Sequence, residues 1–206
     1  MADEDPVPSP EETMRLIGEQ RAATVKHLRG DPLLLIVPWG VAWLLGFGAL
    51  FLHYGLDGVP DATISLWQAL GVLFGAELVS GALTALGISR LGKGVRGESS
   101  AKGAMYGYSW MAGLFLMGLI ASRFTLQLPE AEVSLLWAGG SLTVVALLYM
   151  TGGAIWTSWP MFFMGAWTAA VNGVGVVLGV GWHTLLSAIL LGGGQIAAGL
   201  WLRRCS

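Results

Sequence analysis

Residues 32–54 of the chain read PLLLIVPWGVAWLLGFGALFLHY, an apolar run that contains no Lys, Arg, Asp or Glu. At 1.5 Å per residue, about 20 helical residues cross the ~30 Å hydrocarbon core of a bilayer. Soluble domains carry about a quarter charged residues, whereas this chain of 206 residues carries 12% and is 54% hydrophobic. The composition therefore indicates an integral membrane protein whose first span is this run.

Five further apolar runs follow, separated by short polar turns. The six predicted spans cover residues 32–54, 64–88, 104–124, 133–156, 159–180 and 182–201. Thr157 and Ser158 are expected to turn the fourth span into the fifth, and Gly181 to turn the fifth into the sixth. We therefore predict an all-α membrane protein in which residues 32–204 form a bundle of six transmembrane helices.

All but one of the 11 Lys and Arg residues fall on the same side of these spans, and Arg123 is the exception. Basic residues are enriched in loops that stay in the cytoplasm. The opposite side carries acidic residues, namely Asp57, Asp61, Glu130 and Glu132. We expect a multi-pass protein of the plasma membrane with cytoplasmic N- and C-termini. Nucleic-acid binding has no support, because the basic residues are spread over short membrane-proximal segments.

Residues 1–31 begin with an acidic, proline-rich stretch and lack the basic-then-apolar order of a signal peptide. Ser9 and Glu12 have the spacing of a capping box, and Pro10 suits a first helical turn. Apolar residues then recur at helical spacing at Met14, Ile17, Val25 and Leu28. These features predict a short cytoplasmic amphipathic helix. The alternative is a partly frayed polar tail, because the segment offers few apolar residues.

Short segments within the spans resemble one another. Residues 75–81 (GAELVSG) match residues 193–199 (GGQIAAG), and residues 146–152 (ALLYMTG) match more loosely. The matches keep the same direction through the membrane, which favours three parallel helical-hairpin repeats. The alternative is chance similarity in a chain with 31 glycines.

Small residues allow the close backbone approach on which helix association in lipid depends. We expect such contacts at Gly71, Gly75, Gly175, Gly179 and Gly199, and we favour packing within the bundle over dimer formation.

Glu77 is the only acidic residue inside a predicted span, and it lies near the middle of the bilayer. An ionised acid at this depth is costly, so it should face the bundle interior and have a partner. It is interpreted either as a proton- or cation-binding group or as a neutral acid that links helices. Gln195 and Asn172 are its candidate partners in a substrate- or proton-binding site. Four residues are candidates to complete this polar seam: Ser80, Thr84, Tyr149 and Thr151.

Other chemically active residues give weaker signals. His53 and His183, with Asp57 and Asp61, would suit a metal ion or a pH sensor, but their spacing matches no ligand pattern. We interpret both histidines as interfacial side chains and predict no metal site. Enzyme motifs and a cysteine framework are missing from the sequence, in which Cys205 is the single cysteine. We therefore expect no catalytic residues, no cofactor and no enzyme activity.

The start of the first span, residues 31–46, resembles a widespread group of uncharacterised bacterial six-helix integral membrane proteins, often labelled transporter or permease-like. The similarity extends to the preceding amphipathic segment and to the Ala- and Gly-rich last span that ends at Leu202, Arg203 and Arg204. This resemblance implies a bacterial plasma-membrane protein and transfers no functional residue.

Two functions follow as hypotheses. The first is a small transporter or permease-like protein for a small molecule or cation, with Glu77 as the charge-responsive residue. The second is a non-catalytic partner or regulatory subunit that docks onto a larger export or sensing complex, or that forms a homo-oligomer.

Overall fold

The computed structural model describes residues 9–16, 18, 32–60, 63–91 and 98–204. Every element within these residues is helical. Six helices are long and apolar enough to cross a membrane: Leu33–Tyr54, Leu66–Ser89, Ser100–Phe124, Glu130–Ile155, Trp159–Leu178 and Val180–Arg204. The chain is therefore an all-α, multi-pass membrane protein, as its sequence predicts.

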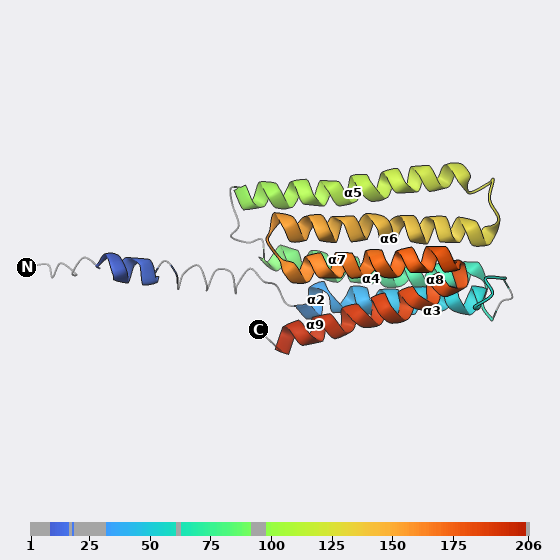
Figure 1. Cartoon of the computed structure of the whole chain (residues 1–206), viewed down its shortest axis with the longest axis horizontal. Coiled ribbons are helices and arrows are strands. Elements are labelled where there is room, and N and C mark those ends of the chain that lie inside the picture. Colours follow the sequence, from blue (N-terminus) through green and yellow to red (C-terminus); the bar gives the residue numbers. More distant parts are fainter. Residues whose placement is uncertain (1–8, 17, 19–31, 61–62, 92–97, 205–206) are drawn as a thin grey trace, which may run out of the picture.

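The helices run side by side along the long axis of the molecule (Figure 1). The first span consists of α2 (Pro32–Leu35) and α3 (Val37–Tyr54), and the next four are α4 (Leu66–Leu91), α5 (Glu98–Phe124), α6 (Glu130–Ile155) and α7 (Trp159–Leu178). The last span is one continuous rod made of α8 (Val180–Leu186), the π-helix η1 (Ser187–Gly193) and α9 (Gly194–Arg204). Because α2 packs against α9, the first span begins at the end of the bundle where the last one finishes.

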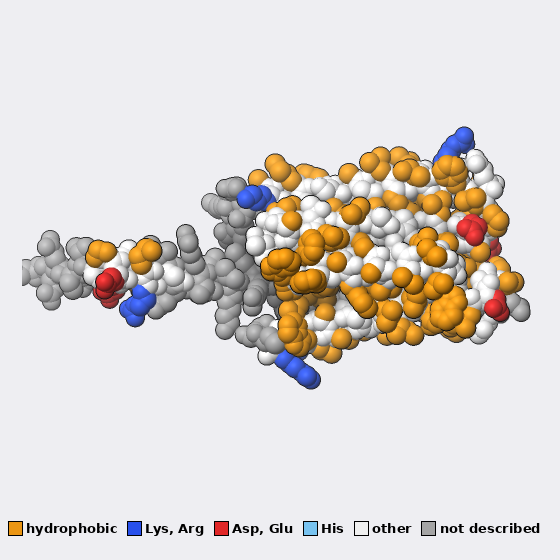
Figure 2. Space-filling view, viewed as in Figure 1, with side chains coloured by type: hydrophobic (Ala, Val, Ile, Leu, Met, Phe, Trp, Pro, Cys, Tyr) orange, Lys and Arg blue, Asp and Glu red, His pale blue; other side chains and the backbone are white. Residues whose placement is uncertain are grey.

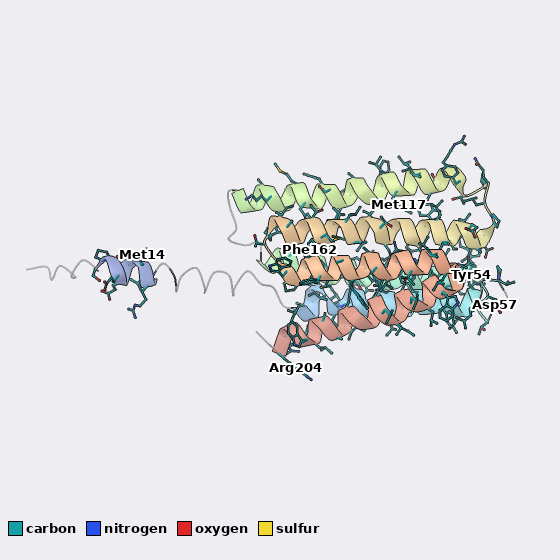
Figure 3. The ribbon with its side chains drawn as sticks, viewed as in Figure 1. Met14, Tyr54, Asp57, Met117, Phe162 and Arg204 are labelled. Atoms are coloured by element: carbon teal, nitrogen blue, oxygen red, sulfur yellow. The ribbon has the colours of Figure 1, made fainter. Side chains whose placement is uncertain are left out.

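Charged side chains gather at the two ends of the bundle, and hydrophobic side chains cover the face between them (Figure 2). We call the end that holds Asp57 and Glu130 the acidic end, and the end that holds Arg203 and Arg204 the basic end. Figure 3 shows Asp57 and Arg204 at these opposite ends. With the exception of Glu77 in the middle of α4, this distribution keeps ionisable side chains out of the hydrocarbon, where each charge would be costly.

The order of the helices leaves α4 and α5 at the two edges of the bundle. α4 packs mainly against α3, α3 packs against the last span, the last span packs against α7, α7 against α6, and α6 against α5. The core between them includes Trp43, Phe47, Leu142 and Leu191. Each predicted hairpin is present as a pair of neighbouring helices. Their surroundings differ, however, and a threefold repeat stays a prediction.

Four of the six spans begin at other residues than the sequence predicts: α4, α5, α6 and the last span. α4 begins at Leu66 because Ser65 and Gln68 form a capping box: Ser65 N donates to Gln68 Oε1 (2.9 Å) and Gln68 N donates to Ser65 Oγ (3.3 Å). α5 begins at Glu98, so this helix includes the largely polar residues 98–103 that precede the apolar run.

The turns joining the last three spans are tight. Thr157 has a φ of 51° at the predicted turn between α6 and α7. The prediction that Gly181 turns the fifth span into the sixth is wrong, because Gly179 makes this turn with a φ of 95°, a value that favours glycine. Gly181 instead lies against the backbone of Gly55 and Leu56, where a Cβ atom would not fit.

The predicted glycine contacts form at some positions and not at others. A Cβ on Gly175 would lie 2.9 Å from His183 Cα, and one on Gly199 would lie 2.6 Å from Val37 Cγ2. For Gly71 and Gly75 the expected packing within the bundle is wrong. A Cβ on either residue meets no atom within 4 Å, because both lie on the open side of the edge helix α4.

Near the N-terminus, residues 10–16 are helical and Glu12 N donates to Ser9 Oγ (3.2 Å), which forms one half of the predicted capping box. The rest of the predicted amphipathic helix, with Val25 and Leu28, lies outside the described residues.

Candidate functional site

Polar side chains inside the bundle gather first at the acidic end, between α3 and α6. His53 Nε2 lies 3.0 Å from Glu130 Oε1, and His53 Nδ1 lies 2.9 Å from Ile64 O. Tyr54 Oη shares a 2.6 Å hydrogen bond with Ser134 Oγ. Both ring nitrogens of His53 thus face acceptors, the backbone carbonyl oxygen of Ile64 and the carboxylate of Glu130.

A second polar cluster lies deeper and joins α6, α7 and α8. Asn172 Nδ2 donates to Gly139 O (2.9 Å) and to Thr143 Oγ1 (3.0 Å). Asn172 Oδ1 lies 2.8 Å from His183 Nε2. An amide oxygen only accepts, so Nε2 of the histidine carries the hydrogen and donates it. Asn172 is only 4% exposed, and all three of its bonds link neighbouring helices.

His53 and His183 lie near span ends, but both side chains are buried inside the bundle. His53 is 5% exposed and His183 is 0% exposed, and each has a specific hydrogen-bond partner. The ring of His183 also lies edge-on to Phe47, with 6.1 Å between centroids. Among the described residues, no group of three His, Cys, Asp or Glu side chains is placed to hold a metal ion.

The sequence contained a signal for the burial of His183. His183 and Gly175 are equally distant along the chain from Gly179, the residue that turns one span into the next. Residues equally distant from so tight a turn lie side by side. The missing side chain of Gly175 leaves the room that the imidazole ring fills.

The last span carries buried polar atoms that make no hydrogen bond within the described residues: His183 Nδ1, Ser187 Oγ, Gln195 Nε2 and Gln195 Oε1. Leaving a buried donor or acceptor unsatisfied costs about 1–3 kcal/mol. At 1.5 Å per helical residue, these three side chains lie about 6, 12 and 24 Å from Gly179. They therefore extend from near the acidic end past the middle of the span.

A π-helix, η1, separates His183 from Gln195. π-helical turns within α-helices are rare and are frequent at functional sites. They also shift the hydrogen-bond register of the helix. Within η1, Leu190 O accepts a hydrogen bond from Trp167 Nε1 of α7 (3.1 Å). The indole thus fixes the last span against α7 beside the unsatisfied groups.

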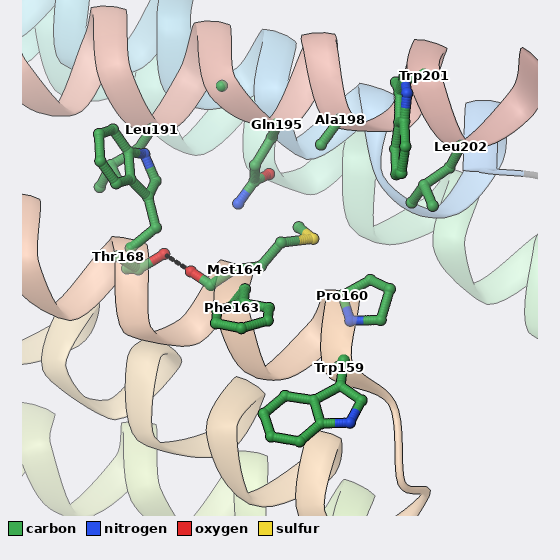
Figure 4. A pocket seen from close by; sticks show the side chains of 12 residues that line it. Trp159, Pro160, Phe163, Met164, Thr168, Leu191, Gln195, Ala198, Trp201 and Leu202 are labelled. Atoms are coloured by element: carbon green, nitrogen blue, oxygen red, sulfur yellow. Dashed lines mark hydrogen bonds between the residues drawn. The ribbon is translucent and has the colours of Figure 1, made fainter. Parts of the chain in front are cut away.

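Gln195 faces a groove between α7 and α9, with a cavity volume of about 430 Å³. In Figure 4 its amide points from α9 towards Met164 and Phe163 of α7. Thr168, which also lines this groove, donates to Met164 O (2.9 Å). Gln195 and Asn172 are both buried, but no hydrogen bond joins their side chains within the described residues.

Glu77 lies apart from both amides, on the edge helix α4. Its side chain is half-buried, and within the described residues its carboxyl makes no hydrogen bond or ion pair. Ser80 and Thr84, on the same side of α4, bond to α3 instead: Ser80 Oγ donates to Pro38 O (2.8 Å), and Trp39 Nε1 donates to Thr84 Oγ1 (2.8 Å).

The remaining members of the predicted polar seam also have other neighbours. Tyr149 packs edge-on against Trp110, with 5.7 Å between ring centroids, and Thr151 Oγ1 donates to Leu147 O within its own helix (2.7 Å).

No protein-family model, no curated protein and no solved structure matches this chain.

Proposed function

We propose that this chain is a small permease-like transporter of the plasma membrane that moves a small polar molecule or cation. In this proposal both termini are cytoplasmic, so the acidic end faces outwards. The observation that carries it is the series of unsatisfied polar atoms on the last span, at His183, Ser187 and Gln195.

The physical reason is the cost of such atoms in a low-dielectric interior. A water molecule or a polar solute that reached them would supply the missing hydrogen bonds. Lysines, arginines and acids are absent from this part of the last span. A solute would therefore meet hydroxyl, imidazole and amide groups, which bind polar molecules without trapping them by charge.

The cluster at the acidic end supplies an entrance to this path. Glu130, whose side chain is 49% exposed, contacts the buried His53. An exposed carboxylate attracts cations to this end of the bundle.

Glu77 is proposed as the charge-responsive residue. α4 packs mainly against α3, so its displacement breaks fewer contacts than displacement of an interior helix would. Protonation removes the cost of a charge at this depth. The position of α4 would thus depend on the protonation state of Glu77.

Cysteine labelling tests whether water reaches the path. In a Cys205→Ser background, Ser187→Cys should react with a water-soluble methanethiosulfonate reagent in protein-containing liposomes. Ala188→Cys is the matched control, because Ala188 belongs to the apolar core and is 4% exposed. Equal lack of reaction at both positions would show a dry interior and would refute the path.

Proton flux tests the role of Glu77. With a potassium diffusion potential, liposomes containing the wild type should acidify faster than empty liposomes, and Glu77→Gln should slow this acidification. Glu132→Gln, at the exposed acidic end, should retain the wild-type rate. Wild-type flux equal to that of empty liposomes, or unchanged flux in Glu77→Gln, would contradict a charge-responsive Glu77.

The open glycines favour a second candidate function, docking onto a membrane partner. Gly71 and Gly75 on α4, and Gly103 and Gly107 on α5, face open space at the two edges of the bundle. Small residues on an exposed face allow another helix to approach closely. If docking is the function, Gly75→Leu should release a stoichiometric partner during purification from native membranes, whereas Gly193→Leu should retain it.

A further inference from the structure

The groove between α7 and α9 has the composition of a ligand site that opens to the bilayer. Four aromatic side chains line it and remain exposed: Trp159 (66%), Phe163 (61%), Trp167 (51%) and Trp201 (62%). These side chains belong to membrane-spanning helices, so a ligand would reach the groove from the hydrocarbon. The volume of about 430 Å³ lies within the range of small-molecule sites, roughly 300–1,000 Å³.

Gln195 adds a specific polar feature to this apolar groove. Its side chain is 6% exposed and neither amide atom has a hydrogen-bond partner within the described residues. An unsatisfied buried amide offers both donors and an acceptor. Met164, a flexible side chain next to the amide in Figure 4, can move aside at low cost.

We propose that this groove binds a neutral, ring-bearing lipophilic molecule from the bilayer whose carbonyl or hydroxyl group hydrogen-bonds to the Gln195 amide. The ligand is neutral because the described residues that line the groove include no Lys, Arg, Asp or Glu. It carries a ring because flat rings pack well against the indole and phenyl faces that line the site. This inference does not depend on the proposed transport function.

The depth of Gln195 separates this ligand class from a phospholipid. Gln195 lies about 13 Å along the helix from Arg204 at the basic end, at 1.5 Å per residue. A phospholipid headgroup stays near the membrane surface and cannot satisfy an amide at that depth. A phospholipid could offer only an acyl chain, which makes no hydrogen bond.

Binding of a decyl-substituted benzoquinone to the full-length protein in nanodiscs tests the proposal, with tryptophan quenching as the readout. Decylbenzene, which has the ring and the tail but no carbonyl, is the matched probe. Its binding is measured by its ability to displace the quinone. Wild-type protein should bind the quinone saturably and about 10-fold more tightly than Gln195→Leu does, as expected for the loss of hydrogen bonds worth about 1.4 kcal/mol. Decylbenzene should compete equally weakly with both proteins.

Two variants locate the site. Ala198→Phe should abolish quinone binding by filling the groove, whereas Ala197→Phe should bind like the wild type because Ala197 is an exposed neighbour outside it. Phe163→Ala removes an exposed ring, leaves the core intact and should weaken binding several-fold.

Each other outcome would overturn the proposal. Absent saturable binding, or equal affinity in Gln195→Leu, means that the amide recognises no carbonyl. Equal competition by decylbenzene and the quinone means that the groove holds acyl chains. Conversion of a dimer to a monomer by Ala198→Phe means that a second copy of the chain occupies the groove.

Discussion

Glycines in the interior of the bundle and glycines on its edge helices have different surroundings. Where α3 meets the last span, a Cβ on Gly192 would lie 2.5 Å from Leu44 N and 2.8 Å from Leu44 Cα. On α4, Gly71 and Gly75 are four residues apart, a spacing of small residues that suits close helix packing, but both face open space. The spacing therefore indicates an ability to pack closely, whereas the order of the helices decides whether a neighbour is present.

The largest effect expected among these variants comes from the contact of Gly192 with the backbone of Leu44. Gly192→Ala should destabilise the protein by about 3 kcal/mol, because the new methyl group meets backbone atoms that cannot rotate away. Gly193→Ala is the matched control, since a Cβ there meets no atom within 4 Å. Reversible unfolding in mixed micelles measures both. Equal stability of the two variants would show that this backbone contact does not form.

The buried amide of Asn172 should give the next largest effect. Asn172→Leu removes the partner of His183 Nε2 and should cost about 1–3 kcal/mol. In the double variant with His183→Leu, the loss should be smaller than the sum of the single losses, because both polar partners are then gone. Additive losses in this cycle would contradict the hydrogen bond.

The hydrogen bonds that attach α4 to α3 should contribute less. Thr84→Val and Trp39→Phe each remove the same bond and should each cost about 0.6 kcal/mol, a typical value for helices in a membrane. The double variant should lose little more stability than either single variant, because all three lack the same hydrogen bond. A loss above about 2 kcal/mol in Thr84→Val would show that the edge helix is held more firmly than its contacts indicate.

The open edge should be the least sensitive region. Gly75→Ala creates no contact within 4 Å, so the change should stay within about 1 kcal/mol and favour the helix through its propensity. The same unfolding assay checks this value. A loss as large as that of Gly192→Ala would indicate that another chain packs against Gly75.

The sequence predicted the features that are determined within a single segment of the chain. The apolar runs gave six spans, and the depth of Asn172 and Glu77 followed from their positions within them. It did not predict which faces meet, because hydrogen-bond partners such as Gly139 for Asn172 depend on the rotation and order of the helices. The π-helix of the last span has no simple sequence signature.

Histidine burial was missed for a related reason. His183 was interpreted from its place near a span end, where a polar side chain usually reaches the interface. The one-residue turn at Gly179 brings it against Gly175 instead. The turn type, once known, predicts the contact.

The proposed path and its direction both rest on six crossings with cytoplasmic termini. Thiol labelling in intact cells tests this claim directly, using a membrane-impermeant reagent and single cysteines. Asp57→Cys and Gln127→Cys, in a Cys205→Ser background, should react from outside, whereas the native Cys205 should react only after permeabilisation. Reaction of Cys205 in intact cells, or protection of both loop cysteines, would contradict the account.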